Sequence, residues 1–159
     1  MPRVVTNLAA RLAGEPWLVH LTSVIVVPDR LLLRLSRGRL GLLTLVGMDT
    51  LVLHTVGRRS GLLRETPLLC VRDSGNDRLL IAGSNWGLDQ HPAWVLNLRA
   101  GGPVGVTRRG YVGPAEVREL TGPARDEAYS LMGRRWSSYP RYAARTDRLI
   151  PVFEVRISS

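Results

Sequence analysis

A series of short segments in which apolar and polar residues alternate constrains the fold of this chain more than any other feature. Alternation with a period of two is typical of a β-strand with one buried face. Turns rich in Gly, Asn and Asp, or in Arg and Gly, separate neighbouring segments, which favours antiparallel pairing. The segments with this pattern are residues 50–56, 66–72, 78–83, 104–108, 111–120 and 150–157. The sequence therefore predicts about six mainly antiparallel strands.

Helices are expected between and before these strands. Pro92 can occupy the first turn of one short helix, and Thr121 can cap a second helix that runs to about Trp136. Leucine and arginine interleave at helical spacing near residues 30–40, so residues 1–47 are expected to form a helical N-terminal segment. These elements predict an α+β fold whose sheet curls into a barrel, because closure removes exposed strand edges.

The length and the basic residues restrict the class of protein. The chain has 159 residues, which is enough for a single domain over residues 1–159 and too few for two. All 22 basic residues are arginine, so chemistry that needs a lysine Schiff base or a lysine-bearing phosphate loop is excluded. The formal charge of +9 favours an anionic partner, which could be nucleic acid, acidic lipid or a phosphorylated cofactor.

Other common sites lack their usual residues. Cys70 is the only cysteine, so an intrachain disulfide or a cysteine metal cluster cannot form, and a reducing cytoplasm is the expected compartment. The histidines His20, His54 and His91 do not make a credible metal set, and no metal site is predicted. The apolar run 17–28 is too short to span a bilayer. Dinucleotide-binding, zinc-protease and serine-hydrolase motifs are missing.

The first candidate site is a loop between two expected strands that combines glycines with three arginines. Guanidinium groups on a flexible connection can surround a phosphate or a carboxylate. The alternative is a solvated hairpin tip whose arginines only add solubility. The residues concerned are Gly57, Arg58, Arg59, Ser60, Gly61 and Arg64.

The second candidate site is the stretch 83–94, in which small residues and two indoles lie between a strand and a helix. Such a stretch could contact a planar ring, but Trp94 could equally be a core residue, because tryptophan on an amphipathic helix usually buries itself. His91 precedes a proline and is more simply explained as a hydrogen-bonding group at the helix start.

The third candidate site contains two phenols, Tyr139 and Tyr142, three residues apart after the second helix. Phenols in a pocket can supply protons. Aromatic packing is the competing explanation, and the residues alone do not decide between the two.

Taken in order along residues 47–157, the motifs resemble the deazaflavin-dependent nitroreductase family. The residues that carry the resemblance are Leu53-His54-Thr55-Val56-Gly57-Arg58-Arg59-Ser60-Gly61, Thr66-Pro67-Leu68, Ser84, His91-Pro92-Ala93-Trp94, Asn97-Leu98, Tyr139-Pro140 and Thr146-Asp147-Arg148-Leu149-Ile150-Pro151. Each motif alone is weak, but the ordered set is specific. The resemblance implies a split β-barrel of the FMN-binding type, formed by residues 48–159, that binds reduced coenzyme F420.

The resemblance also implies the activity and the site residues. The resemblance implies transfer of a hydride from reduced F420 to a small organic acceptor such as a quinone, an enone or a nitro compound, so no protein nucleophile is required. The implied cofactor-binding residues are Arg58, Arg59, Ser60, Gly61 and Arg64 for the anionic tail, and Thr66, Pro67, Ser84, Asn85, Trp94 and Asn97 around the deazaflavin. The implied catalytic residues are Tyr139, Tyr142 and Ser84, and Trp86 joins the two tyrosines in the acceptor pocket.

The chain departs from the family pattern at two places that concern the acceptor more than the cofactor. Trp86 replaces a usual glycine, and the connection between Tyr142 and Thr146 is about three residues shorter than usual, with a further tyrosine lost. These departures leave open whether nitroimidazole reduction is retained.

Several alternatives remain open from the sequence. The same barrel could bind FMN instead of F420. A nucleic-acid-binding module is disfavoured, because the arginines are spread without a recognition-helix motif. The leucine and arginine pattern of the N-terminal segment leaves open a peripheral membrane contact. A homodimer is also open, because related split barrels often dimerise.

Overall fold

The computed structural model describes residues 31, 35–36 and 47–157. The expected helical segment 1–47 therefore lies almost entirely outside the described residues. Within it, Leu31 and Leu35 are helical and exposed.

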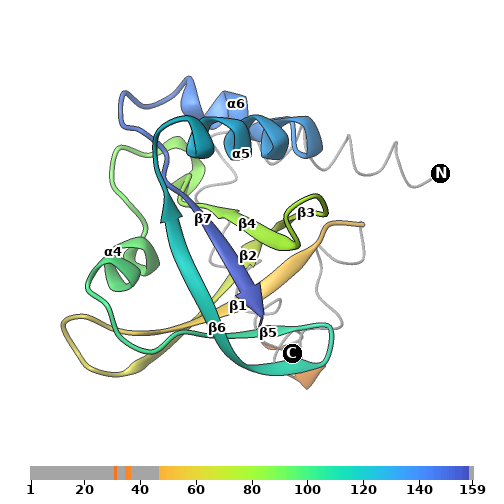
Figure 1. Ribbon diagram of the computed structural model, residues 1–159. Helices are drawn as coiled ribbons and strands as arrows, with labels where there is room; N and C mark the ends of the chain where they lie inside the picture. The colour runs from red at the N-terminus through yellow and green to blue at the C-terminus, as the bar shows by residue number, and fades with distance from the viewer. Residues whose placement is uncertain (1–30, 32–34, 37–46, 158–159) are drawn as a thin grey trace.

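The described part of the chain alternates strands with short helices (Figure 1). The elements are β1 (Thr50–Val56), β2 (Leu63–Leu69), β3 (Val71–Asp73), β4 (Arg78–Ala82), the 3₁₀ helix η1 (Asn85–Gly87), α4 (Ala93–Arg99), β5 (Gly105–Arg108), β6 (Tyr111–Leu120), α5 (Gly122–Arg135), α6 (Ser138–Ala143) and β7 (Val152–Ile157). The strands form one antiparallel sheet in the order β2-β1-β5-β6-β7-β4-β3.

The sheet curls into a half-barrel because its two edge strands are neighbours in the chain. β2 and β3 are the first and last strands of the order, yet only Cys70 lies between them. The N–H of Cys70 donates to the carbonyl oxygen of Asp49 at 2.9 Å, which holds this link against the start of β1. The two edges must therefore approach each other, and the expectation of an α+β split barrel is confirmed.

The expected strand over residues 66–72 is wrong in one respect. The structure divides this run at Cys70, so that β2 belongs to one edge of the sheet and β3 to the other, and the strands number seven instead of about six. The alternation of side chains continues through the link, so the sequence pattern contains no sign of the division.

Two apolar cores lie on the two faces of the sheet, as the period of two requires. Leu79 and Ile81 point into the barrel, where they meet Phe153 and Val155 of β7. Leu80, between them in the chain, points to the opposite face and packs under α5 and α6, which lie together across one side of the sheet in Figure 1.

The helices are attached by arginine side chains. Arg125 of α5 is 8% exposed and donates from Nε and Nη2 to the carbonyl oxygen of Ile150 at 3.0 and 2.6 Å. Arg99 of α4 forms a bidentate pair with Glu119 of β6 at 2.9 and 2.6 Å. α4 and α5 agree with the expected helices to within about a residue, whereas α6 is a helix that the sequence pattern did not predict.

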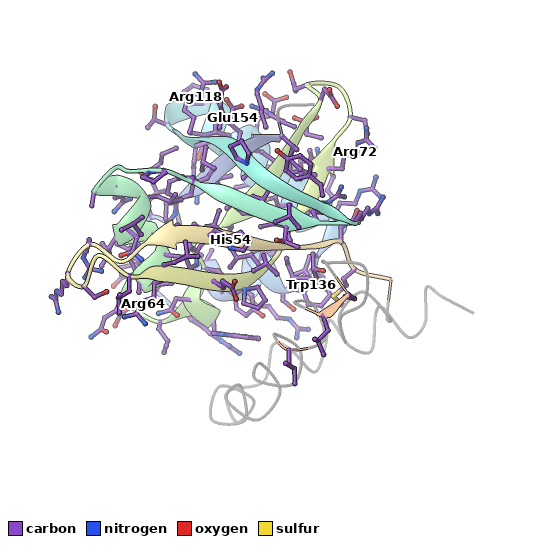
Figure 2. All side chains as sticks on the ribbon, turned by 90° about the horizontal axis from the view of Figure 1, so that it is seen from below. His54, Arg64, Arg72, Arg118, Trp136 and Glu154 are labelled. Atoms are coloured by element: carbon purple, nitrogen blue, oxygen red, sulfur yellow. The ribbon has the colours of Figure 1, made fainter. Side chains whose placement is uncertain are left out.

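A buried carboxylate on β7 is neutralised by arginines from both neighbouring strands. Glu154 is 4% exposed and accepts hydrogen bonds at 2.8 Å from Arg78 of β4 and from Arg118 of β6. Figure 2 shows Arg118 and Glu154 next to each other on the sheet. Burial by itself would raise the pKa of Glu154, but these hydrogen bonds outweigh burial and the pKa is lowered.

The Glu154→Gln variant should lose roughly 1 to 3 kcal/mol of unfolding free energy at neutral pH, because the arginines lose their shared counter-charge. The folded-state pKa of Glu154 lies below the reference of 4.5, so its contribution is present above about pH 4.5 and is lost as pH falls through the folded pKa. Urea unfolding of parent and variant across this acid range measures both effects. The exposed Glu116→Gln on β6 is the matched control, and an unchanged acid profile in Glu154→Gln would contradict the prediction.

Candidate functional site

The turn between β1 and β2 is closed by its own backbone. The N–H of Gly57 donates to the carbonyl oxygen of Leu62 at 2.8 Å, and the N–H groups of Ser60 and Gly61 donate to the carbonyl oxygen of Gly57 at 3.1 and 2.7 Å. Gly61 has a φ of +66°, a conformation that favours glycine, and a Cβ at Gly57 would meet the Ser60 hydroxyl at 2.7 Å. The loop therefore has a defined shape that both glycines allow.

Three arginines on this turn, Arg58, Arg59 and Arg64, form what we call the arginine hairpin. All three side chains are exposed, and within residues 47–157 none of them forms an ion pair with a carboxylate. Arg64 donates to the hydroxyl of Ser60 at 3.3 Å. The adjacent acid, Glu65, faces His54 at 3.8 Å. Three guanidiniums without a counter-charge create a local anion-binding potential.

Asn97 of α4 connects the helix to the base of the arginine hairpin. Its Oδ1 accepts from the N–H of Arg58 at 3.2 Å and from the Arg58 guanidinium at 3.4 Å, and its Nδ2 donates to the hydroxyl of Thr55 at 3.3 Å. Asn97 is 6% exposed. The hydrogen bonds of Asn97 therefore hold the start of the arginine hairpin against α4.

Strand register separates the two β2 residues that the sequence placed at the cofactor. Thr66 pairs with Leu53, a residue of the barrel interior, whereas Pro67 pairs with Val52 on the opposite face. Paired residues of antiparallel strands share a face. Thr66 therefore shares its face with the barrel interior, and Pro67 does not.

Trp94 belongs to the barrel core. It is 5% exposed and its ring centroid lies 5.5 Å from that of Phe153. Of the two explanations that the sequence left open for Trp94, core packing is the one that this geometry supports.

The turn between β4 and α4 has an unusual backbone. Asn85, Trp86 and Gly87 have φ values of 46°, 59° and 81°, so three successive residues are left-handed. Glycine adopts this conformation freely and asparagine tolerates it, but an indole-bearing residue does not favour it. The left-handed φ of Trp86 gives a physical reason for the glycine that the family pattern usually has here.

Arg148 holds this turn in place from the loop before β7. It donates to the carbonyl oxygens of Ser84 at 2.7 Å and Leu88 at 2.8 Å, and its Nη1 lies 3.2 Å from Nδ1 of His91. Burial, followed by the charge of Arg148, lowers the pKa of His91, so the imidazole is neutral near pH 7 and can accept this hydrogen bond. In the sequence, Arg148 is only one member of the 146–151 motif, and nothing local indicates that it contacts this turn.

Trp86 and the tyrosines form a continuous row of ring contacts. Trp86 meets Tyr142 at 6.0 Å between centroids, Tyr142 meets Tyr139 at 6.2 Å, and Tyr139 meets Tyr129 at 5.9 Å, all edge to face. Such geometry is favourable for aromatic pairs. Trp86 is thus turned toward the protein, and the row links the turn after β4 to α6.

Tyr139 and Tyr142 are each 4% exposed. Burial raises the pKa of both phenols, so both remain protonated at neutral pH. A protonated phenol can donate a proton or a hydrogen bond but cannot act as a base.

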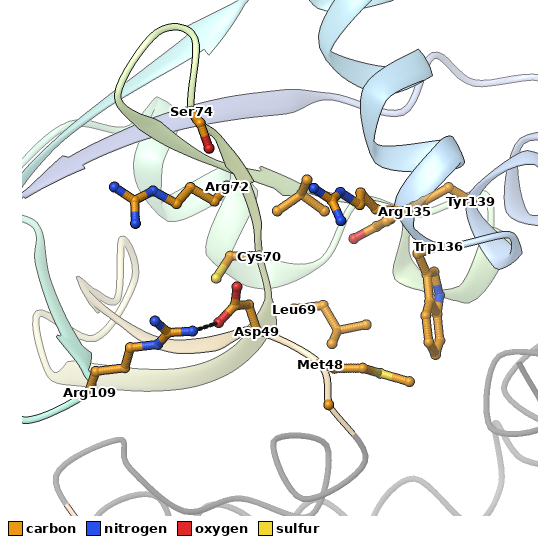
Figure 3. A pocket seen from close by; sticks show the side chains of 12 residues that line it. Met48, Asp49, Leu69, Cys70, Arg72, Ser74, Arg109, Arg135, Trp136 and Tyr139 are labelled. Carbon is orange, nitrogen blue, oxygen red and sulfur yellow. Dashed lines mark hydrogen bonds and ion pairs between the residues drawn. The ribbon is translucent and has the colours of Figure 1, made fainter. Parts of the chain in front are cut away.

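A pocket of about 480 Å³ lies where β2 passes into β3 (Figure 3). We call it the tyrosine pocket, because Tyr139 is part of its wall. Its volume falls in the range of small-molecule sites. The lining residues are Gly47, Met48, Asp49, Leu69, Cys70, Val71, Arg72, Ser74, Arg109, Arg135, Trp136 and Tyr139.

The arginine hairpin and the tyrosine pocket lie at opposite ends of the β1–β2 ladder. Leu63 pairs with Val56 at the hairpin end, and Leu69 pairs with Thr50 at the pocket end. Six residue steps along a strand correspond to about 20 Å. In Figure 2, Arg64 and Trp136 lie toward opposite ends of these strands. The structure therefore joins Asn97 to the arginine hairpin and places Tyr139 in the pocket, away from the three hairpin arginines.

Comparison with known proteins shows a family match over most of the chain. Residues 31–156 match the family described as F420H(2)-dependent quinone reductase. A Mycobacterium tuberculosis protein named F420H(2)-dependent quinone reductase is 32% identical over 127 residues, covering 74% of this chain and 79% of that protein. No helix among the described residues has the length and apolar character to cross a bilayer.

Two solved structures share this fold. One, described as an F420-H2 dependent reductase, is 34% identical with a TM-score of 0.60 and covers 68% of this chain and 94% of its own. The other, described as a domain-swapped dimer, has the same identity and TM-score and covers 68% of this chain and 80% of its own.

Proposed function

The chain belongs to the F420H2-dependent quinone reductase family, and from this premise we propose that it binds F420 at the arginine hairpin and reduces a quinone beside Tyr139. The observation that supports the cofactor site most strongly is the uncompensated charge of Arg58, Arg59 and Arg64. Other arginines of the described chain, such as Arg78 and Arg99, are neutralised by carboxylates.

The residues at the hairpin suit an elongated anionic cofactor. The open space beside Gly61 lets a phosphate approach the backbone, and Ser60 adds a hydroxyl next to Arg64. Thr66 and Ser84 would lie along the ring system, with Asn85 and Asn97 supporting it. Pro67 would shape strand β2, and Trp94 would shape the barrel core that supports the residues along the ring system.

Reduced F420, when bound, supplies a hydride, so the protein has to bind, orient and protect the reacting groups. Arg148 fixes the Ser84 backbone. Tyr139 and Tyr142 would donate a hydrogen bond or a proton to the quinone oxygen, because burial keeps them protonated. Trp86 and Tyr142 are outside the lining of the tyrosine pocket, so Trp86 would limit the width of the acceptor space indirectly, through the ring contacts that join Tyr142 to Tyr139.

Titration of the purified protein with F420 and with FMN, at low and at raised salt, tests the cofactor proposal. We expect tighter binding of F420 and a Kd that rises with salt, because exposed charges are screened. Tighter binding of FMN than of F420 would contradict the proposal that the cofactor is F420. Anaerobic mixing of the F420H2 complex with a quinone panel then tests the reaction.

Tyr139→Phe should leave F420 affinity nearly unchanged and lower kcat about threefold to tenfold, the value of one neutral hydrogen bond. The effect is limited because water in the pocket can supply the proton instead. Stopped-flow oxidation of bound F420H2 measures the step. Tyr129→Phe is the control, since its hydroxyl donates to the carbonyl oxygen of Tyr139 at 2.7 Å and lies outside the pocket lining. Equal rates for parent and Tyr139→Phe would make Tyr139 a packing residue.

Trp86→Gly should change acceptor selectivity more than cofactor affinity. Glycine relieves a left-handed backbone that costs roughly 1 to 2 kcal/mol for other residues, while the edge contact with Tyr142 is lost. Bulky quinones should gain in relative rate over small ones. Identical relative rates in variant and parent would rule out this role.

A homodimer is the proposed assembly, supported by the domain-swapped dimer among the similar structures. Light scattering after size-exclusion chromatography measures it. A monomer at all concentrations would exclude it. Residence in the cytoplasm also stays a proposal, as does membrane contact through the N-terminal segment, which cell fractionation and liposome flotation would test.

A further inference from the structure

The mouth of the tyrosine pocket has an excess of positive charge. Its lining contains three exposed arginines, Arg72, Arg109 and Arg135, which we call the arginine rim, and one carboxylate, Asp49. Asp49 is already shared, because it accepts from Arg109 and, at 3.3 Å, from Arg108. Arg72 has only a solvent-exposed ion pair at 3.7 Å, and Arg135 has no ion pair in the described part of the chain. The rim can therefore accept another anion.

The interior of the pocket is apolar on the side away from two of these arginines. Figure 3 shows Leu69, Met48 and Trp136 together on that side, away from Arg72 and Arg109. A flat ring could lie against these side chains while a substituent reaches the rim. Ligand sites commonly combine an apolar wall with a few placed polar groups in this way.

Two further lining groups, Cys70 and Tyr139, are uncharged. Burial raises the pKa of the Cys70 thiol to about 11 and also raises the pKa of Tyr139. Both side chains are therefore protonated at neutral pH and do not repel an anion. Asp49 is the only carboxylate among the lining residues.

We propose that the tyrosine pocket selects acidic quinones, with the ring on the apolar wall and an ionised hydroxyl or carboxylate substituent on the arginine rim. This inference rests on the proposed function, because it takes the tyrosine pocket as the acceptor site. Guanidinium groups bind carboxylates and phenolates through charge-assisted hydrogen bonds, which a neutral quinone does not offer. The arginine rim therefore accounts for the preference for an acidic quinone over a neutral one.

The substituent takes no part in the redox step. The quinone gains two electrons and two protons and becomes a hydroquinone, while F420H2 is oxidised to F420. One proton travels with the electron pair as a hydride, and the second comes from Tyr139 or water. The proton that the oxidised cofactor releases to solvent restores that donor, so the two sides balance. A carboxylate substituent stays ionised throughout, whereas an ionised hydroxyl on the quinone ring becomes an ordinary phenol on reduction and takes up one further proton from solvent.

Binding to the protein without F420 measures the preference apart from catalysis. Calorimetric titration uses lawsone, a hydroxynaphthoquinone ionised at neutral pH, and menadione, a neutral methylnaphthoquinone of similar size. We expect lawsone to bind about tenfold more tightly at low salt. Each exposed charge pair contributes little, but the contributions of several pairs add. The preference should shrink as salt is raised.

The double variant Arg72→Gln with Arg135→Gln should lower lawsone affinity to that of menadione and leave menadione binding unchanged. Both positions are exposed, so the fold should be retained, and circular dichroism checks this. Arg141→Gln, which changes an exposed arginine of α6 outside the pocket lining, is the control and should keep the preference. Arg109 is left in place because it pairs with Asp49.

Equal affinities for the two quinones in the parent protein, or a preference that survives the double variant, would overturn the inference. Competition by triglutamate against lawsone would overturn it too, since the rim would then serve the acidic tail of the cofactor. If the F420H2 complex reduces neither quinone, the proposed function fails. The binding preference is measured without cofactor, so its result does not depend on whether the F420H2 complex reduces a quinone.

Discussion

Replacing Arg58 and Arg59 together by alanine should weaken F420 binding by about a hundredfold at low salt. Each charge-assisted contact contributes at least about 1.5 kcal/mol, and the two contacts together correspond to about two orders of magnitude in Kd. We use the lower end of the range because both side chains are exposed and screened by solvent. The salt dependence of Kd should flatten as well, because fewer charges meet the anionic tail.

Fluorescence titration of F420 at several salt concentrations measures this effect. The matched control is Arg134→Ala with Arg141→Ala, which removes the same charge from exposed positions on α5 and α6. The control separates a local contact from the general field of a protein with a charge of +9. If the control weakens binding as much as the hairpin variant does, the hairpin is only one part of a diffuse positive field.

Arg148→Met should lower kcat by about a hundredfold with a much smaller change in F420 affinity. Arg148 is a positioning residue, whose hydrogen bonds to the carbonyl oxygens of Ser84 and Leu88 hold a turn with three successive left-handed residues. Without them the strained turn can relax, and a displacement of about 1 Å at a reacting centre can cost a hundredfold in rate.

Single-turnover kinetics with bound F420H2 measures the rate, and Arg141→Met is the control for loss of an arginine near α6. The pH profile supplies a readout that a merely structural role would not change. Because the pKa of His91 is lowered, acid below about pH 6.5 begins to protonate it, and a charged imidazole cannot accept from Arg148. Parent kcat should fall over this range. The charge of Glu119 raises the pKa of His91 and favours this protonation, whereas the charge of Arg99 lowers the pKa and shifts the fall to lower pH. A parent-like kcat in Arg148→Met would refute the positioning role.

Periodicity was sufficient for the regular elements of the fold. β1 has the predicted bounds, since Leu51, Leu53 and Thr55 alternate with residues of the other face. α5 was predicted because Thr121 and Pro123 mark a helix start in the sequence itself. These signals are local, and no distant residue is needed to read them.

The candidate site was predictable only as a set of residue types. Gly57, Gly61 and the arginines are adjacent in the chain, so their common location is local. Their lack of carboxylate partners among the described residues depends on the tertiary structure, because an acid from any strand could have neutralised them. The functional roles of these residues stay predictions until binding and kinetics test them.

The sequence by itself determined the strand alternation, the helix starts, the all-arginine charge and the order of motifs that indicates the family. Tertiary structure alone decided that the 66–72 run divides at Cys70, that Trp94 enters the core, and that Arg148 reaches Ser84 from 64 residues away. The physical reason is the range of the interactions. Alternation and capping depend on neighbours within a few residues, whereas sheet closure, burial and counter-charges depend on segments that meet only once the chain has folded.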